Sequence, residues 1–194
     1  MVGERLFDYL FGLQTAAAHF QIQMLRKHKE SAMGLMDILQ HAMTSDSPEQ
    51  HFDSVAGSAS TQQLGTGLAE AMRSDQTPPF GSIVGQLFGN SNPAQQAGLL
   101  NHFLGALSPS ALSGVAGGAL ARILGPGQTQ ITPDQATQLS PSQVTEIAAH
   151  AEKIQPDVID SVGQFYAQHS GLIKTLGGAA LMVTLAKMKQ NLLA

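Results

Sequence analysis

The sequence lacks cysteine and tryptophan, and charged residues make up only 12% of its 194 residues. Without thiols the chain forms no disulfide, carries no thiolate nucleophile and offers no cysteine-type zinc site. Globular chains are typically about 25% charged, so this surface must be wetted mainly by uncharged polar groups. The hydrophobic content of 43% is nevertheless enough to build a buried core.

Basic stripes and long apolar runs are also missing. The net charge is −4, and no basic cluster extends beyond Arg26, Lys27 and Lys29, so we expect no nucleic-acid partner. No stretch offers about 18 uninterrupted apolar residues, and Glu4 and Asp8 interrupt the N-terminal apolar segment, which argues against a secretory signal. We expect a cytoplasmic protein, with a periplasmic or membrane-peripheral location left open.

Repeated helix-start signals are the most informative pattern present. Asn92-Pro93-Ala94-Gln95, Thr132-Pro133-Asp134-Gln135 and Ser140-Pro141-Ser142-Gln143 each combine a capping side chain, a proline and a glutamine. The cap accepts from free backbone N–H groups, the proline has no donor to leave unpaired, and the glutamine reaches back to the cap. The expected helices span residues 4–29, 35–43, 48–57, 61–73, 79–88, 93–106, 109–124, 141–153, 156–168 and 171–191, with a single turn at 132–139.

These signals predict an all-α, multihelical fold with short helices in one or two packed bundles. The stretch Gly125-Pro126-Gly127-Gln128-Thr129-Gln130 is the best candidate linker. We therefore predict an N-terminal helical subdomain at 33–125 and a C-terminal bundle at 131–194. Residues 1–32 form an amphipathic helix that either packs on the domain, docks on a membrane surface or partner, or stands outside the working protein.

Paired glycines mark two of the expected helices as candidate interaction surfaces. Gly117-Gly118 and Gly177-Gly178 are each followed by alanine. Glycine inside a helix costs about 1 kcal/mol relative to alanine, so such pairs indicate close backbone approach at a helix crossing. The crossing lies either within the monomer or between copies of the chain.

Phenylalanines supply the remaining interaction candidates. Phe7 and Phe11 lie on the apolar side of the N-terminal helix, where a membrane surface or partner would contact them. Phe80 follows two prolines, and we interpret it either as part of a recognition loop or as the anchor of the next helix.

Polar candidates are few and match no ligand signature. His41, His51 and Asp53 gather near a predicted helix–turn–helix junction, although their spacing fits no known metal site. Glu146 and His150 lie four residues apart and share a helix face, as half of a metal site or an acid–base pair would. We assign no catalytic, cofactor-binding or metal-ligating residue and expect no cofactor.

A family resemblance lies in Met33-Gly34-Leu35-Met36-Asp37, the stretches 74–81 and 85–89, the glycine-rich apolar helices and the helix starts with Ser or Thr, Pro and Gln. In these segments the chain resembles bacterial proteins of unknown function in the YidB-like group. The resemblance covers about residues 33–155 and implies a multihelical fold and a bacterial source. It implies no activity and no functional residues.

These observations favour a non-enzymatic interaction or assembly protein that self-associates through charge-poor, Gly/Ala-rich helices. Its partner is then a second copy or another protein. One alternative is a peripheral membrane-surface protein held by the N-terminal amphipathic helix. Another is a small-molecule binder, or an enzyme, with a pocket between helices.

Overall fold

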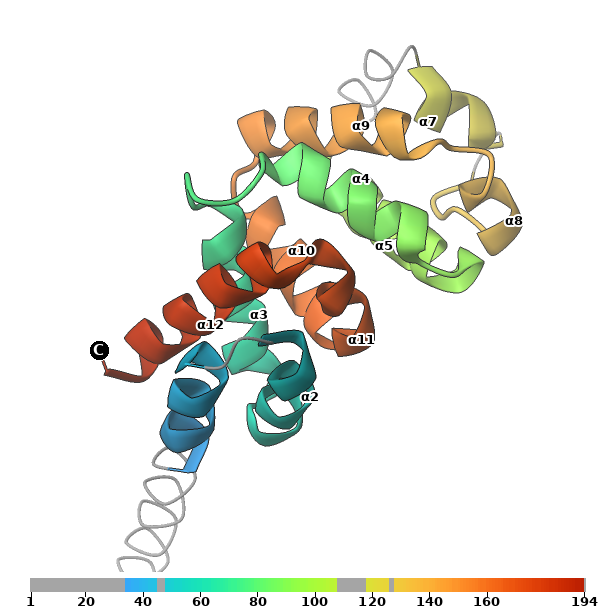
Figure 1. Cartoon of the computed structure of the whole chain (residues 1–194). Helices are drawn as coiled ribbons and strands as arrows, with labels where there is room; N and C mark the ends of the chain where they lie inside the picture. The colour runs from blue at the N-terminus through green and yellow to red at the C-terminus, as the bar shows by residue number, and fades with distance from the viewer. Residues whose placement is uncertain (1–33, 45–47, 108–117, 126–127, 194) are drawn as a thin grey trace, which may run out of the picture.

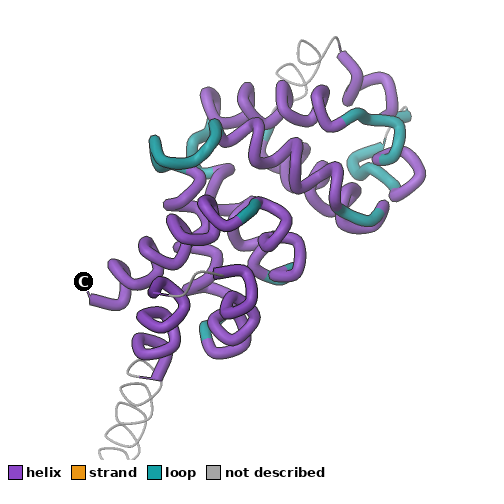
Figure 2. The backbone as a smooth tube through the Cα atoms, viewed as in Figure 1, coloured by secondary structure: helices purple, strands orange, loops and turns teal. Residues whose placement is uncertain are grey.

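A computed structural model of the chain describes residues 34–44, 48–107, 118–125 and 128–193. In this part of the chain the regular secondary structure is helical and no strand occurs, which confirms the all-α, multihelical prediction (Figure 2). A helix at 34–44 comes first. The elements that follow are α2 (Pro48–Ser58), α3 (Thr61–Met72), α4 (Phe80–Asn90), α5 (Pro93–Ala106), α7 (Ala119–Ile123), α8 (Pro133–Ala136), α9 (Pro141–Ile154), α10 (Val158–Ala167), α11 (Ser170–Ile173), the 3-10 turn η2 (Lys174–Leu176) and α12 (Gly178–Leu193).

Capping boxes fix the starts of several helices as the sequence predicts. Asn92, Thr132 and Ser140 each accept from the backbone N–H three residues later, and the glutamine at that position accepts from the N–H of the cap. The proline of each signal occupies the first helical turn. The start of α10 differs, since it begins at Val158 behind Asp157 rather than at residue 156.

The helices pack in two groups that lie next to each other (Figure 1). In one group, α3 packs against α10 and α12, and α12 also contacts α2. In the other, α4 packs against α9, and α5 contacts α8 and α9. Contacts of α10 with α5, and of η2 with α4, join the groups.

This packing does not coincide with the expected division at residues 125–130. Helices α3 and α4 precede that linker, yet their main partners, α10 and α9, follow it. The chain therefore leaves the first group after α3, builds the second group, and returns with α10. Residues 1–32, the third expected segment, lie outside the described residues.

One continuous hydrophobic core runs through both groups. Its largest fully buried side chains include Phe52 on α2, Phe88 on α4, Phe103 on α5 and Tyr166 on α10. Leu39 of the first helix joins the same cluster. Burying a large apolar side chain contributes about 1.5–3 kcal/mol, so these residues tie segments from every part of the described chain together.

The paired glycines differ from the prediction at Gly177, which makes no close helix crossing, and Gly118 lies at a helix start. Gly118 has φ of +70° and is the N-cap residue of α7. Gly177 has φ of +83° and separates η2 from α12, and a Cβ on it would meet no atom within 4 Å. Both glycines use their freedom to adopt positive φ, Gly118 at the start of α7 and Gly177 between η2 and α12. Gly178 is the first residue of α12, and Gly117 lies outside the described residues.

Other glycines make the close crossings. A Cβ on Gly163 of α10 would lie 2.6 Å from the carbonyl oxygen of Gly65 on α3. A Cβ on Gly81 of α4 would lie 2.6 Å from the carbonyl oxygen of Thr145 on α9. Small residues thus let both principal helix pairs approach backbone to backbone, inside the molecule.

Candidate functional site

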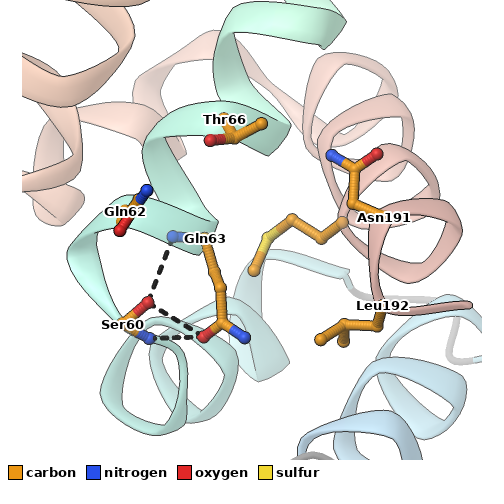
Figure 3. A pocket seen from close by; sticks show the side chains of 7 residues that line it. Ser60, Gln62, Gln63, Thr66, Asn191 and Leu192 are labelled. Atoms are coloured by element: carbon orange, nitrogen blue, oxygen red, sulfur yellow. Dashed lines mark hydrogen bonds between the residues drawn. The ribbon is translucent and has the colours of Figure 1, made fainter. Parts of the chain in front are cut away.

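A pocket lies between the N-terminal end of α3 and the C-terminal end of α12. This α3–α12 pocket has a volume of about 210 Å³. Figure 3 shows the side chains of Asn191 and Leu192 on α12 facing Gln63 and Thr66 on α3 across it. The pocket is lined by Ser60, Gln62, Gln63, Thr66, Met188, Asn191 and Leu192.

A capping box holds one wall of the pocket in place. The Ser60 hydroxyl accepts from the Gln63 N–H at 3.2 Å, and the Ser60 N–H donates to Gln63 Oε1 at 2.9 Å. The Ser60 hydroxyl also donates to Gln63 Oε1 at 3.0 Å. Because its oxygen is held in this way, the Gln63 carboxamide keeps a fixed orientation, with its nitrogen on the side facing Leu192 (Figure 3).

The floor of the pocket includes an apolar side chain that packs at a glycine of α3. Met188 of α12 is 2% exposed. The Met188 side chain packs against α3 at Gly67, where an added Cβ would collide with it. The bare backbone at Gly67 therefore lets Met188 lie against α3. The pocket consequently combines apolar surface from Met188 and Leu192 with hydroxyl and carboxamide groups.

The side chains that line the pocket carry no charge. Ion pairs lie elsewhere. Lys174 donates to Asp53 at 2.8 Å. Arg73 binds Asp160 through two hydrogen bonds of 2.8 and 2.7 Å that join α3 to α10.

The Arg73–Asp160 pair changes the titration of both groups. Hydrogen bonding to Arg73 holds the pKa of the Asp160 carboxyl below its usual value, against a smaller opposing effect of partial burial. The same hydrogen bonds raise the pKa of Arg73. Both side chains are partly exposed, at 38% and 53%, so water screens the interaction and its contribution to stability is small. We interpret it as an orienting contact between two helices.

The predicted histidine cluster forms only in part. The rings of His41 and His51 meet edge to face with centroids 5.1 Å apart. Asp53 instead pairs with Lys174. The structure thus brings the imidazoles of His41 and His51 together. The Asp53 carboxylate pairs with Lys174 instead, and no sequence pattern predicts that pair.

Glu146 and His150 lie on α9 as expected. Glu146 is exposed and His150 is half-buried, and the described residues show no hydrogen bond or ion pair between them. In the described ranges, no group of three or more His, Cys, Asp or Glu side chains is placed to hold a metal ion.

The phenylalanine candidates have different outcomes. Phe80 is 1% exposed and begins α4 inside the core. Of its two interpretations, the anchor is confirmed and the exposed recognition loop is wrong, because a side chain this deeply buried is inaccessible to a partner. Phe7 and Phe11 lie outside the described residues.

None of the residues that line the pocket was predicted from the sequence, although the sequence carries one signal for them. Ser60-Thr61-Gln62-Gln63 is a capping-box pattern without the proline that marks the other helix starts. Nothing in the sequence indicates that Asn191 and Leu192 lie opposite this start, because that depends on how α12 packs against α3.

No family model, curated protein or solved structure matches the chain. The resemblance to YidB-like proteins, and the bacterial source it implies, therefore stay predictions. Among the described helices, none combines the length and the apolarity required to cross a lipid bilayer.

Proposed function

We propose that the protein is a non-enzymatic interaction or assembly protein that self-associates through a charge-poor surface. The observation that carries this proposal is the distribution of charge. Between Gln76 and Thr145 the chain contains one positive and one negative residue, Arg122 and Asp134. The whole net charge of −4 therefore resides in the rest of the chain.

This segment supplies most of one helix group. It forms α4, α5, α7, α8 and the first turn of α9 (Figure 1). We define the charge-poor surface as the exposed, described side chains of residues 77–145. Its exposed polar positions include Ser82, Asn90, Thr129, Gln130, Thr137 and Gln138.

A polar surface without net charge favours contact between identical chains. Net charge of one sign opposes association of like molecules, whereas two copies that meet at this surface bring no net charge together. Amide and hydroxyl groups also bond to their equivalents on a second copy, since each both donates and accepts. The glycines in close contacts, Gly65, Gly81 and Gly163, already pack within the monomer. Of the predicted glycine pairs, Gly177 lies between η2 and α12 rather than on a helix face, so we propose the polar surface of this segment as the interface.

The test is the absolute mass measured by light scattering on a sizing column over a concentration series. We expect the measured mass of the wild-type protein to exceed the monomer mass of 20.4 kDa and to rise with protein concentration. A Ser82→Glu/Gln138→Glu variant should shift toward the monomer. The matched control, Ser161→Glu/Gln168→Glu, adds the same charge at exposed positions of the α10 region and should keep the wild-type mass.

Two results would overturn the proposal. A wild-type protein with the monomer mass at every concentration would exclude self-association. Equal dissociation by the two charged variants would show that total charge, rather than this surface, controls the mass.

A further inference from the structure

We propose that the α3–α12 pocket binds a small, uncharged amide. This inference is independent of self-association, because the pocket lies in the other helix group (Figure 1). It depends on four features of the pocket, namely a fixed donor, free polar groups on both walls, an apolar floor and the lack of charge.

The fixed donor is the carboxamide nitrogen of Gln63. Its partner oxygen, Oε1, accepts from the N–H and the hydroxyl of Ser60 at 2.9 and 3.0 Å. These two hydrogen bonds assign the oxygen of the carboxamide, so Nε2 is the atom that remains free to donate to a ligand. The capping box has already restricted the rotamers of Gln63. The Gln63 side chain therefore loses little further entropy when it donates to a ligand carbonyl.

Free polar groups lie on both walls. Within the described residues, the side chains of Gln62, Thr66 and Asn191 make no hydrogen bond to the protein, and all three are exposed. Carboxamide and hydroxyl groups can both donate and accept hydrogen bonds. A ligand amide presents both functions within one planar unit, so it matches walls that offer both on opposite sides.

The floor of the pocket is apolar. Met188 is almost fully buried, and Leu192 packs against the core from the same helix. Methionine is flexible and polarisable, which suits it to contact a small alkyl group of variable shape. We therefore place the methyl of an acetamide-type ligand against Met188 and Leu192, and its carbonyl and N–H toward the polar walls.

Charge and size narrow the ligand further. No lining side chain is ionisable, so a ligand that carries a full charge would lose hydration without gaining a counter-ion. The volume of about 210 Å³ equals roughly seven water molecules at about 30 Å³ each. A ligand of about eight non-hydrogen atoms is of this size, and N-acetylglycinamide is such a molecule.

The experiment titrates N-acetylglycinamide into the full chain and follows nuclear magnetic resonance signals. The probes are the Met188 methyl group and the side-chain amides of Gln62, Gln63 and Asn191. We expect saturable shifts at these groups with a dissociation constant on the order of 1–10 mM, as befits so small a ligand. N-acetylglycinate, which has the same size but carries a carboxylate, should bind at least about tenfold more weakly.

Matched variants assign the site. Thr66→Val and Asn191→Leu should each weaken binding about threefold or more, because each removes hydrogen-bonding groups from one wall. The controls Thr61→Val and Gln190→Leu alter exposed neighbours that do not line the pocket, and should bind as wild type does. Unchanged spectra of the unbound Thr66 and Asn191 variants away from the pocket verify that the fold is intact.

Three outcomes would overturn the proposal. The first is an absence of saturable shifts up to about 50 mM, several times the expected dissociation constant. The second is equal binding of the neutral and anionic ligands. The third is wild-type affinity in both wall variants. None of these outcomes bears on the light-scattering test, so the two proposals fail separately.

Discussion

A single methyl group added at Gly163 tests how closely α3 and α10 approach. In Gly163→Ala the new Cβ would lie 2.6 Å from the Gly65 carbonyl oxygen and 3.1 Å from the Cβ of Ala69. Both obstacles belong to the α3 helix, and the nearer one is backbone, so no flexible side chain can move aside. Helix α3 must shift by several tenths of an ångström.

Two opposing effects set the magnitude. Overpacking a close contact costs about 1–3 kcal/mol, and the backbone obstacle places this site near the upper end. Alanine has a higher helix propensity than glycine, which returns up to about 1 kcal/mol. We therefore expect a net loss of about 1–2 kcal/mol in the free energy of unfolding. For a chain of this size that loss corresponds to a fall in Tm of roughly 3–6 °C.

The assay is urea unfolding followed by circular dichroism, with Gly57→Ala as the matched control. Gly57 lies in α2, and a Cβ on it would meet no atom within 4 Å. That substitution should raise stability by about 0.5 kcal/mol through helix propensity alone. If Gly163→Ala were as stable as Gly57→Ala, the close approach of α3 and α10 would be refuted.

Three further predictions follow from caps, charge and the N-terminal segment. Ser140→Ala removes the cap of α9 and should lower the free energy of unfolding by about 1 kcal/mol, whereas Ser82→Ala, at an exposed position within α4, should change it by less than about 0.5 kcal/mol; a similar loss in both would refute the role of the cap. Because the pKa of Asp160 is lowered in the folded state, the contribution of its carboxylate to stability is present above the unfolded pKa of about 3.9 and is lost as the pH falls through the folded pKa. Asp160→Asn should therefore lower the free energy of unfolding by less than about 1 kcal/mol at pH 7, and by progressively less below about pH 4. Urea unfolding measures this loss, and a loss that grows in acid would contradict the prediction. The membrane-surface alternative requires that the full chain bind anionic liposomes in flotation and that a chain starting at Met33 not bind them; equal behaviour of the two chains would end that alternative.

Local signals in this sequence predicted local structure well. The boxes at Asn92, Thr132 and Ser140 form as expected because every atom that they need lies within four residues. Helix α5 accordingly spans residues 93–106, as predicted. The fold class follows from many such starts separated by short connections.

The roles of individual glycines were harder to predict. A glycine pair at 177–178 and a glycine in a close crossing look alike in sequence, because both are small residues among apolar ones. Gly81 and Gly85 do carry a signal, since their spacing of four places them on one helix face against α9. Gly163 carries none, because its partner on α3 lies far away along the chain and is chosen only by tertiary packing.

The site was least accessible for the same reason. Ser60 and Gln63 form a local pattern, but Asn191 faces them only because α12 returns to α3 at the end of the described chain. Likewise the pairing of His41 with His51 is short-range and was anticipated, whereas the Asp53–Lys174 pair spans 121 positions and was not. Sequence patterns thus predicted groups of residues that are close in the chain. The packing of α10, α11 and α12 against earlier helices determines which of these groups lie close together in space.

The return of the chain to α3 has a consequence for biosynthesis. Arg73 at the end of α3 and its partner Asp160 on α10 are 87 residues apart. At a translation rate of about 5–20 residues per second, roughly 4–17 s pass between the synthesis of the end of α3 and the synthesis of Asp160 on α10, its principal packing partner. During that interval the apolar faces of α2 and α3 are synthesised but uncovered. The nascent chain is therefore a candidate client for chaperones that bind exposed apolar segments, and a ribosome stalled between α4 and α9 would hold it in that state.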